Sequence, residues 1–136
     1  MSRAKGGQGA AAAEKSERSR ERAVELAESL GAMGAIEVKR FFGGFGLVLD
    51  AVQFAFVMKS TLYLRVDDST RAAFVSSGAA PFTYATRSAQ VKVASYYEAP
   101  VDALDDPQVL RSWAAKAYAS ALAARRPARR APHEGR

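Results

Sequence analysis

The chain has 136 residues, no cysteine and a formal net charge of +6, so it can form one domain with its own core but no disulfide or thiolate metal site. The positive charge lies at the two ends, because residues 1–22 hold six Lys/Arg and three Glu, and residues 123–136 hold five Arg and one Glu. The body, residues 23–122, holds nine basic and ten acidic residues. No stretch approaches the ~20 consecutive apolar residues of a membrane span, and the start lacks a secretory apolar core, so we expect a cytoplasmic protein without membrane contact.

The N-terminal segment, residues 1–15, is rich in Gly and Ala and carries no large apolar side chain after the initiator. We therefore predict a disordered tail. The ordered domain is predicted to span residues 16–122. It begins with a helix over residues 16–30, whose apolar side chains recur at helical spacing: Ala23, Leu26, Ala27, Leu30 and Met33. Gly31 and Gly34 are predicted to end this helix.

A series of short strands follows, separated by breaks at residues 42–46, 50–51 and 59–60. These breaks have the length of hairpin turns, so neighbouring strands are predicted to be antiparallel. Within two strands the apolar residues alternate and are predicted to share a face: Phe54, Phe56 and Met58 in one, and Leu62, Leu64 and Val66 in the next.

A second, short helix is predicted over residues 69–77, with Asp67, Asp68 or Ser69 as its cap and Gly78 at its end. Two more strands are predicted near residues 82–86 and 91–97. In the second, consecutive tyrosines should point to opposite faces of the sheet: Tyr96 and Tyr97.

The last helix has the strongest start signal, Asp106 as N-cap followed by Pro107 at the first helical position. Its apolar stripe is predicted to contain Leu110, Trp113, Ala114, Ala117 and Ala121. Residues 123–136 are predicted to form a disordered, Arg-rich tail. The order helix, strand meander, helix, two strands, helix indicates an α+β fold with two layers, in which helices cover a mainly antiparallel sheet of five to six short strands.

Three stretches, in this order, resemble the TfoX/Sxy N-terminal domain family. Residues 39–50 (KRFFGGFGLVLD) resemble its arginine, aromatic, Gly-Gly, aromatic, Gly segment, and residues 62–67 (LYLRVD) resemble its next strand. Residues 95–100 (SYYEAP) resemble a third segment, which leads into the last helix. The resemblance covers about residues 20–120. It implies a two-layer fold like that of type III secretion chaperones, and a regulatory role in the co-activation of competence genes alongside a cyclic-AMP-dependent regulator.

The aromatic-glycine segment is the preferred candidate for a partner-binding turn, comprising Phe41, Phe42, Gly43, Gly44, Phe45 and Gly46. A phosphate-binding loop is disfavoured, because such glycines precede a helix N-terminus, whereas a strand is predicted after these. Glycine is expected to supply the positive φ of a tight turn. Alternation predicts that Phe41 and Phe42 face opposite sides, so at least one ring should be free to contact a protein partner.

No catalytic, metal-binding or cofactor-binding set is predicted. The single histidine, His133, lies in the C-terminal tail and has no partner at ligand spacing. The serines have no predicted base beside them, and the Asp pairs stand where helix caps are expected. We therefore expect a protein that is not an enzyme.

The sequence leaves three functions open. The first is a regulatory protein-interaction module, standing alone as one domain and acting on the transcription apparatus. The second is a nucleic-acid-binding protein that uses the tail arginines to neutralise phosphates: Arg125, Arg126, Arg129 and Arg130. The third is a chaperone-like homodimer that holds a peptide, so both a monomer and a homodimer remain open.

Overall fold

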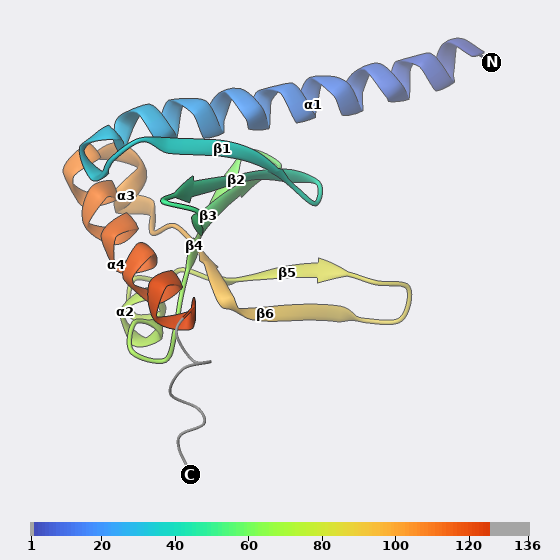
Figure 1. The fold of residues 1–136 in the computed structure, drawn as a ribbon. Coiled ribbons are helices and arrows are strands. Elements are labelled where there is room, and N and C mark those ends of the chain that lie inside the picture. The colour runs from blue at the N-terminus through green and yellow to red at the C-terminus, as the bar shows by residue number, and fades with distance from the viewer. Residues whose placement is uncertain (1, 126–136) are drawn as a thin grey trace.

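The computed structural model describes residues 2–125 of the chain. Figure 1 shows the elements in chain order: α1 (Ser2–Ser29), the 3-10 turn η1 (Gly31–Met33), β1 (Ile36–Phe41), β2 (Gly44–Leu49), β3 (Val52–Met58), β4 (Thr61–Arg65), α2 (Arg71–Ser76), β5 (Pro81–Ala85), β6 (Gln90–Glu98), α3 (Val101–Asp105) and α4 (Pro107–Arg125). The predicted α+β fold is confirmed. The short helix α3 was not predicted.

The six strands form one antiparallel sheet in the order β1-β2-β3-β4-β6-β5. Two predicted hairpin turns are found at their expected places. Both central residues have positive φ in each turn, at Asp50 (51°) and Ala51 (66°), and at Lys59 (52°) and Ser60 (67°). Positive φ at both positions is the property of type I′ turns, whose twist matches that of antiparallel strands. The chain therefore folds back immediately at each of these turns.

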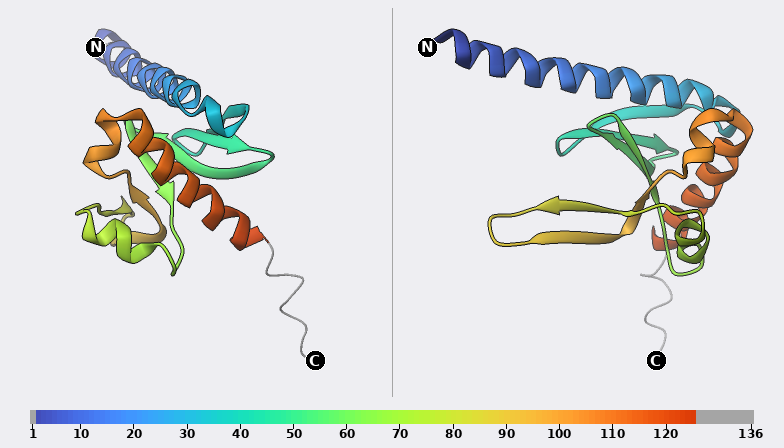
Figure 2. Two further views of the ribbon diagram at one scale, coloured as in Figure 1. Left: turned by 90° about the vertical axis from the view of Figure 1, so that its left-hand side faces the viewer. Right: turned by 180° about the vertical axis from the view of Figure 1, so that it is seen from behind.

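The helices cover one face of the sheet. The core between the layers contains the buried residues of α1 and α4 that the helical spacing predicted: Ala23, Leu26, Leu30, Leu110, Ala114, Ala117 and Ala121. They pack on inward residues of the strands, including Leu62, Leu64 and Val66, which share a face as predicted. Figure 2 shows the β5–β6 hairpin extending away from α4, so that its outer half has no helix against it. We call the sheet face opposite the helices the open face.

The N-terminal segment differs from its prediction. Residues 2–15 continue α1 as helix and are not a disordered tail. The run of alanines at residues 10–13 has high helix propensity, and the packed turns around Ala23 supply a formed helix onto which further turns add at little cost. The C-terminal tail also starts later than predicted, because α4 continues to Arg125. The remainder of that predicted tail, residues 126–136, lies outside the described residues.

A bulge in β3 corrects the prediction that Phe54 and Phe56 share a face. The β2–β3 register shifts between Leu47 and Val48, which pair with Ala55 and Gln53, so that Phe54 is left between two pairs. An extra residue of this kind reverses the alternation. Phe54 therefore belongs to the core beneath the helices, as Ala55 does, while Phe56 points to the open face.

Candidate functional site: an aromatic hollow on the open face

Phe56 is the centre of a cluster of aromatic rings on the open face. Its ring centroid lies 4.9 Å from Phe41, 5.0 Å from Tyr63, 5.1 Å from Phe82 and 4.8 Å from Tyr96. These separations are typical of favourable aromatic pairs. The ring of Phe56 is only 1% exposed although no helix covers it, because its aromatic neighbours surround it. The open face thus has a small apolar core of its own.

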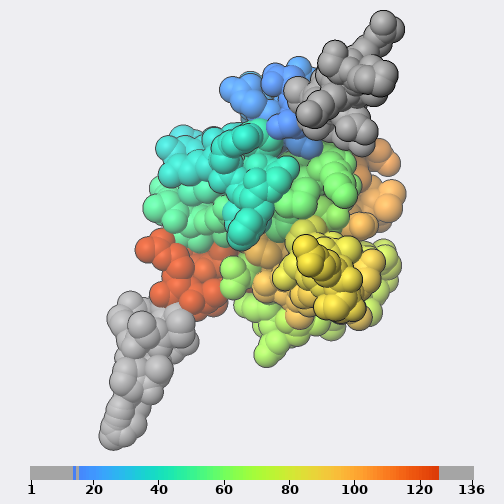
Figure 3. All heavy atoms as spheres, turned by 90° about the vertical axis from the view of Figure 1, so that its right-hand side faces the viewer, coloured from blue at the N-terminus to red at the C-terminus, as the bar shows by residue number. Residues whose placement is uncertain are grey.

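Beside this cluster lies a hollow of about 470 Å³, between the β1–β2 turn and the β5–β6 hairpin. Its aromatic lining consists of Phe41, Phe42, Phe56, Phe82, Tyr84 and Tyr96, with Val93 and Ser95 completing the wall. We call it the aromatic hollow. Two rings at its rim reach into solvent, Phe42 at 88% exposure and Tyr84 at 47%. Figure 3 looks onto the ends of the two hairpins that enclose it.

The predicted partner-binding turn is shorter than expected. Only Phe42 and Gly43 form the turn, and Gly44, Phe45 and Gly46 are the first residues of β2. Phe45 is 6% exposed and belongs to the core beneath the helices, so it is not available to a partner at the hollow. Of the six predicted residues, the structure brings Phe41 and Phe42 to the aromatic hollow.

The rings of Phe41 and Phe42 do not face opposite sides as alternation predicted. They pack edge to face with their centroids 4.7 Å apart. Phe42 has a φ of 52°, so the strand geometry ends before it and the turn folds its ring back toward its neighbour. The prediction that a glycine supplies the positive φ is also wrong, since Phe42 takes the left-handed conformation that L-residues adopt only at a cost.

The glycines of β2 serve close packing. A Cβ on Gly44 would overlap the carbonyl oxygen of Val57 and lie 3.1 Å from Cα of Met58, so the backbones of β2 and β3 leave no room for a side chain. A Cβ on Gly46 would overlap Oε1 of Gln53, which is the end of a flexible side chain. A strand follows these glycines, as predicted. The arrangement lacks the helix start that a phosphate loop requires.

A second hollow, of about 410 Å³, adjoins the first and shares Phe41 and Tyr96 with it. Its polar lining consists of Gln53, Arg65 and Arg125, and we call it the basic hollow. The guanidinium carbon of Arg65 lies 5.6 Å from the Tyr96 ring centroid, within range of a cation–π interaction. The Gln53 amide nitrogen, Nε2, donates to the Tyr96 hydroxyl at 3.5 Å. Tyr96 faces the hollows and Tyr97 the core, as the sequence predicted.

Of the four arginines predicted to contact nucleic acid, the structure describes one. Arg125 lies exposed in the last turn of α4 and lines the basic hollow. Arg126, Arg129 and Arg130 lie outside the described residues, as does His133. Among the side chains that the structure describes, those of residues 14 and 16–125, there is no group of three or more His, Asp or Glu placed to hold a metal ion. No helix in the described part of the chain is long and apolar enough to cross a membrane.

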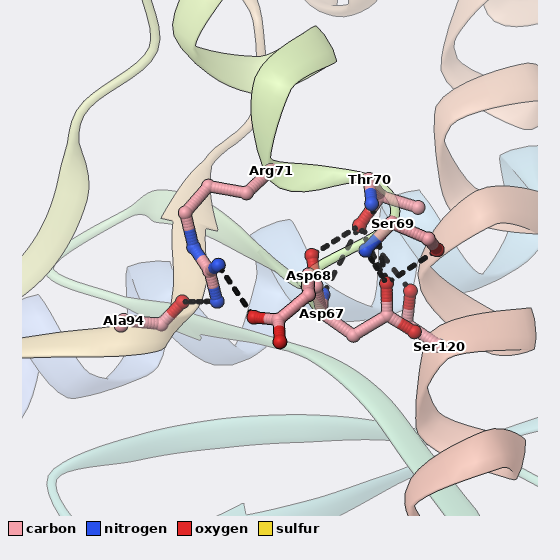
Figure 4. A network of polar contacts seen from close by, with 7 residues as sticks. All are labelled: Asp67, Asp68, Ser69, Thr70, Arg71, Ala94 and Ser120. Atoms are coloured by element: carbon pink, nitrogen blue, oxygen red, sulfur yellow. Dashed lines mark hydrogen bonds and ion pairs between the residues drawn. The ribbon is translucent and has the colours of Figure 1, made fainter.

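A polar network at the start of α2 has a structural explanation (Figure 4). The Asp67 carboxylate accepts hydrogen bonds from the Ser69 backbone nitrogen at 2.9 Å, the Ser69 hydroxyl at 2.7 Å and the Thr70 backbone nitrogen at 3.2 Å. These bonds, chiefly the one from the Ser69 hydroxyl, hold the pKa of Asp67 below its ordinary value. The Thr70 and Ser120 hydroxyls lie 3.4 Å apart and connect this turn to α4. The prediction that Asp67, Asp68 or Ser69 caps α2 is wrong, because the N-cap is Thr70, which makes no side-chain cap hydrogen bond, and Asp67 instead stabilises the turn that precedes the helix.

Arg71 ties the same turn to the sheet. Its guanidinium donates to the Asp68 carboxylate at 2.7 Å and to the Ala94 carbonyl oxygen of β6 at 3.3 Å (Figure 4). Asp68 is thus engaged in a local ion pair on the surface. The cluster fixes the position of α2 and contributes no residue to either hollow.

The family comparison agrees with the resemblance found in the sequence. The family model described as TfoX N-terminal domain matches residues 28–121. This range contains all six strands and the whole lining of the aromatic hollow. No curated protein matches the chain.

Proposed function

The chain belongs to the TfoX N-terminal domain family, and on that premise we propose that it is a regulatory module that binds a protein partner and catalyses no reaction. The observation that supports the proposal is the aromatic hollow, with Phe42 held 88% exposed at its rim. The partner belongs, in this proposal, to the transcription apparatus of the cell, where the module contributes to competence control.

The energetics of Phe42 favour a binding role. Its ring gains little from the fold because most of it is in solvent, while its left-handed φ of 52° costs the folded state about 1–2 kcal/mol. Burying an exposed Phe side chain is worth about 1.5–3 kcal/mol. A partner that covers Phe42 and fills the hollow would gain this burial energy. Aromatic residues commonly dominate the binding energy of protein interfaces in this way.

The experiment compares three forms of the full chain as immobilised bait in cytosol from the source cells, with quantitative mass spectrometry as the readout. The forms are the wild type, Phe42→Ser, and the control Val101→Ser, which removes an apolar side chain 74% exposed on α3, outside the hollow. We expect at least one protein to be retained by the wild type and the control and reduced about tenfold or more by Phe42→Ser. Equal recovery by all three forms would contradict the proposal.

A further inference from the structure

The aromatic hollow and the basic hollow share Phe41 and Tyr96 in their linings and differ in chemistry, and we propose that together they bind one acidic, apolar peptide segment of the partner. In this segment a large apolar side chain fills the aromatic hollow and a nearby Asp or Glu meets the arginines of the basic hollow. The inference rests on the proposed function and specifies the class of partner that the site recognises.

The aromatic hollow selects the apolar part of the segment. Its volume of about 470 Å³ lies within the range of pockets that hold a ligand group, and six of its eight lining residues are aromatic. The lining strands come from distant parts of the sequence, since β1 meets the β5–β6 hairpin here. A large aliphatic or aromatic side chain placed between Phe42 and Tyr84 would cover the two rings now in solvent.

The basic hollow selects the acidic part. Among residues 14 and 16–125, whose side chains the structure describes, the ion pairs lie elsewhere: Arg22 with Glu25, Lys39 with Glu37, and Arg71 with Asp68. In that part of the chain Arg65 and Arg125 have no carboxylate partner. The buried Nε of Arg65 has no hydrogen-bond acceptor, a property that it shares with Arg71 and Arg111. Arginine's planar set of donors matches a carboxylate in a bidentate manner. The contact of Arg65 with the Tyr96 ring holds the guanidinium beside the shared wall of the two hollows.

Charge complementarity favours an acidic peptide over nucleic acid at this surface. A duplex-binding surface commonly neutralises six to ten phosphates, whereas two arginines line the basic hollow and the body of residues 23–122 carries one more acidic than basic residue. The adjoining apolar wall also offers nothing to a phosphate. A peptide rises about 3.3 Å per residue, so neighbouring side chains of one segment can reach both hollows across the shared residues Phe41 and Tyr96.

The test pans a phage-displayed library of random dodecapeptides on the immobilised full chain and sequences the recovered phage. We expect enrichment of peptides with a large apolar residue within a few positions of Asp or Glu. The strongest peptide is then synthesised with a fluorophore, and its dissociation constant is measured by fluorescence polarisation. Phe42→Ser should weaken binding about tenfold or more.

The charge step is tested separately. Arg65→Gln and Arg125→Gln should each weaken binding about two- to fivefold, as should replacing the peptide's acidic residue by its amide. Arg125 is exposed at the helix end, so its variant remains informative if Arg65→Gln lowers stability. Arg111→Gln removes a charge from α4 outside both hollows and should leave binding unchanged. Affinity should also decrease as salt concentration rises.

Four results would overturn the inference. In the panning, these are enrichment of peptides without acidic residues, or recovery of no peptide above an unrelated control bait. In the affinity measurements, it is an equal effect of Arg125→Gln and Arg111→Gln. In light scattering, it is a doubling of the mass that depends on Phe42, which would show that a second copy of the chain occupies the hollow. Any of these leaves the proposed function standing if Phe42→Ser still removes a partner in the cytosol experiment. Loss of that effect would instead contradict the proposed function itself.

Discussion

Replacing Phe42 by Asn separates the stability of the fold from the function of the hollow. The φ of 52° at this position is a conformation that Asn adopts readily and Phe adopts at a cost of about 1–2 kcal/mol. The substitution loses the contact between Phe42 and Phe41, whose centroids are 4.7 Å apart, and such pairs contribute about 0.5–1.5 kcal/mol. Little buried area is lost, because Phe42 is 88% exposed. The free energy of unfolding should therefore stay the same or rise by up to about 1 kcal/mol.

The assay is urea unfolding followed by circular dichroism at neutral pH, with Phe41→Asn as the matched comparison. Phe41 is half-buried and packs 4.9 Å from Phe56, so its replacement should lower the free energy of unfolding by about 1–3 kcal/mol. Both variants should lose peptide affinity, since both rings line the hollow. If Phe42→Asn lowers the free energy of unfolding by more than about 1 kcal/mol, the ring stabilises the fold and the argument for a binding role is refuted.

Three further predictions concern stability. Gly44→Ala should lower the free energy of unfolding by about 3 kcal/mol, because the new Cβ meets the β3 backbone. Gly46→Ala should lower it by less than about 1 kcal/mol, because the Gln53 side chain can move. Comparable values for the two variants in urea unfolding would contradict this account of the glycines. Asp67→Asn should lower the free energy of unfolding above pH 3.8, the ordinary pKa of Asp67. A lowered folded-state pKa stabilises the fold only while the carboxyl is ionised, so the difference in unfolding free energy between the variant and the wild type should shrink as the pH of the measurement is lowered. Asp106→Ala should lower the thermal midpoint of unfolding, by an amount that corresponds to about 1 kcal/mol of stability. The substitution removes the carboxylate that accepts a hydrogen bond from the Gln108 backbone nitrogen, in the first turn of α4, at 2.9 Å. An unchanged midpoint would show that this cap contributes nothing.

Local signals made most of the fold predictable. Helical spacing identified the buried stripes of α1 and α4, and the pair Asp106–Pro107 located the start of α4 to the residue. The bulge at Phe54 was not predictable from alternation, because the shift of register depends on how β2 and β3 pair and on what each face packs against. The left-handed φ of Phe42 was missed for a similar reason, since a glycine stood next to it and was the expected holder of that conformation.

The candidate site was predicted only on its β1–β2 side. The opposite wall comes from β5 and β6, about forty residues later, and no local pattern shows that two hairpins will lie across one hollow. One signal was present in the sequence. Phe82 alternates with Tyr84 and Val91 with Val93, and the structure pairs Phe82 with Val93 and Tyr84 with Val91, which places these side chains on one face of the β5–β6 hairpin. Alternation of this kind in both strands of a hairpin indicates one apolar face, which either packs against another layer or forms a binding surface.

The two faces of the sheet have different surroundings, since helices cover one face and leave the other open. An antiparallel sheet with helices on one side ordinarily carries polar residues on the other, yet this open face is aromatic, and the bulge at Phe54 turns Phe56 onto it. The rings of Phe56 and its neighbours shield one another, which accounts for the aromatic floor without any partner. Mutual shielding does not account for Phe42, which adds a strained backbone and an exposed ring at the rim. A partner would therefore gain more from covering the rim of the hollow than from its floor, to which Phe42 is connected through Phe41 by centroid separations of 4.7 and 4.9 Å.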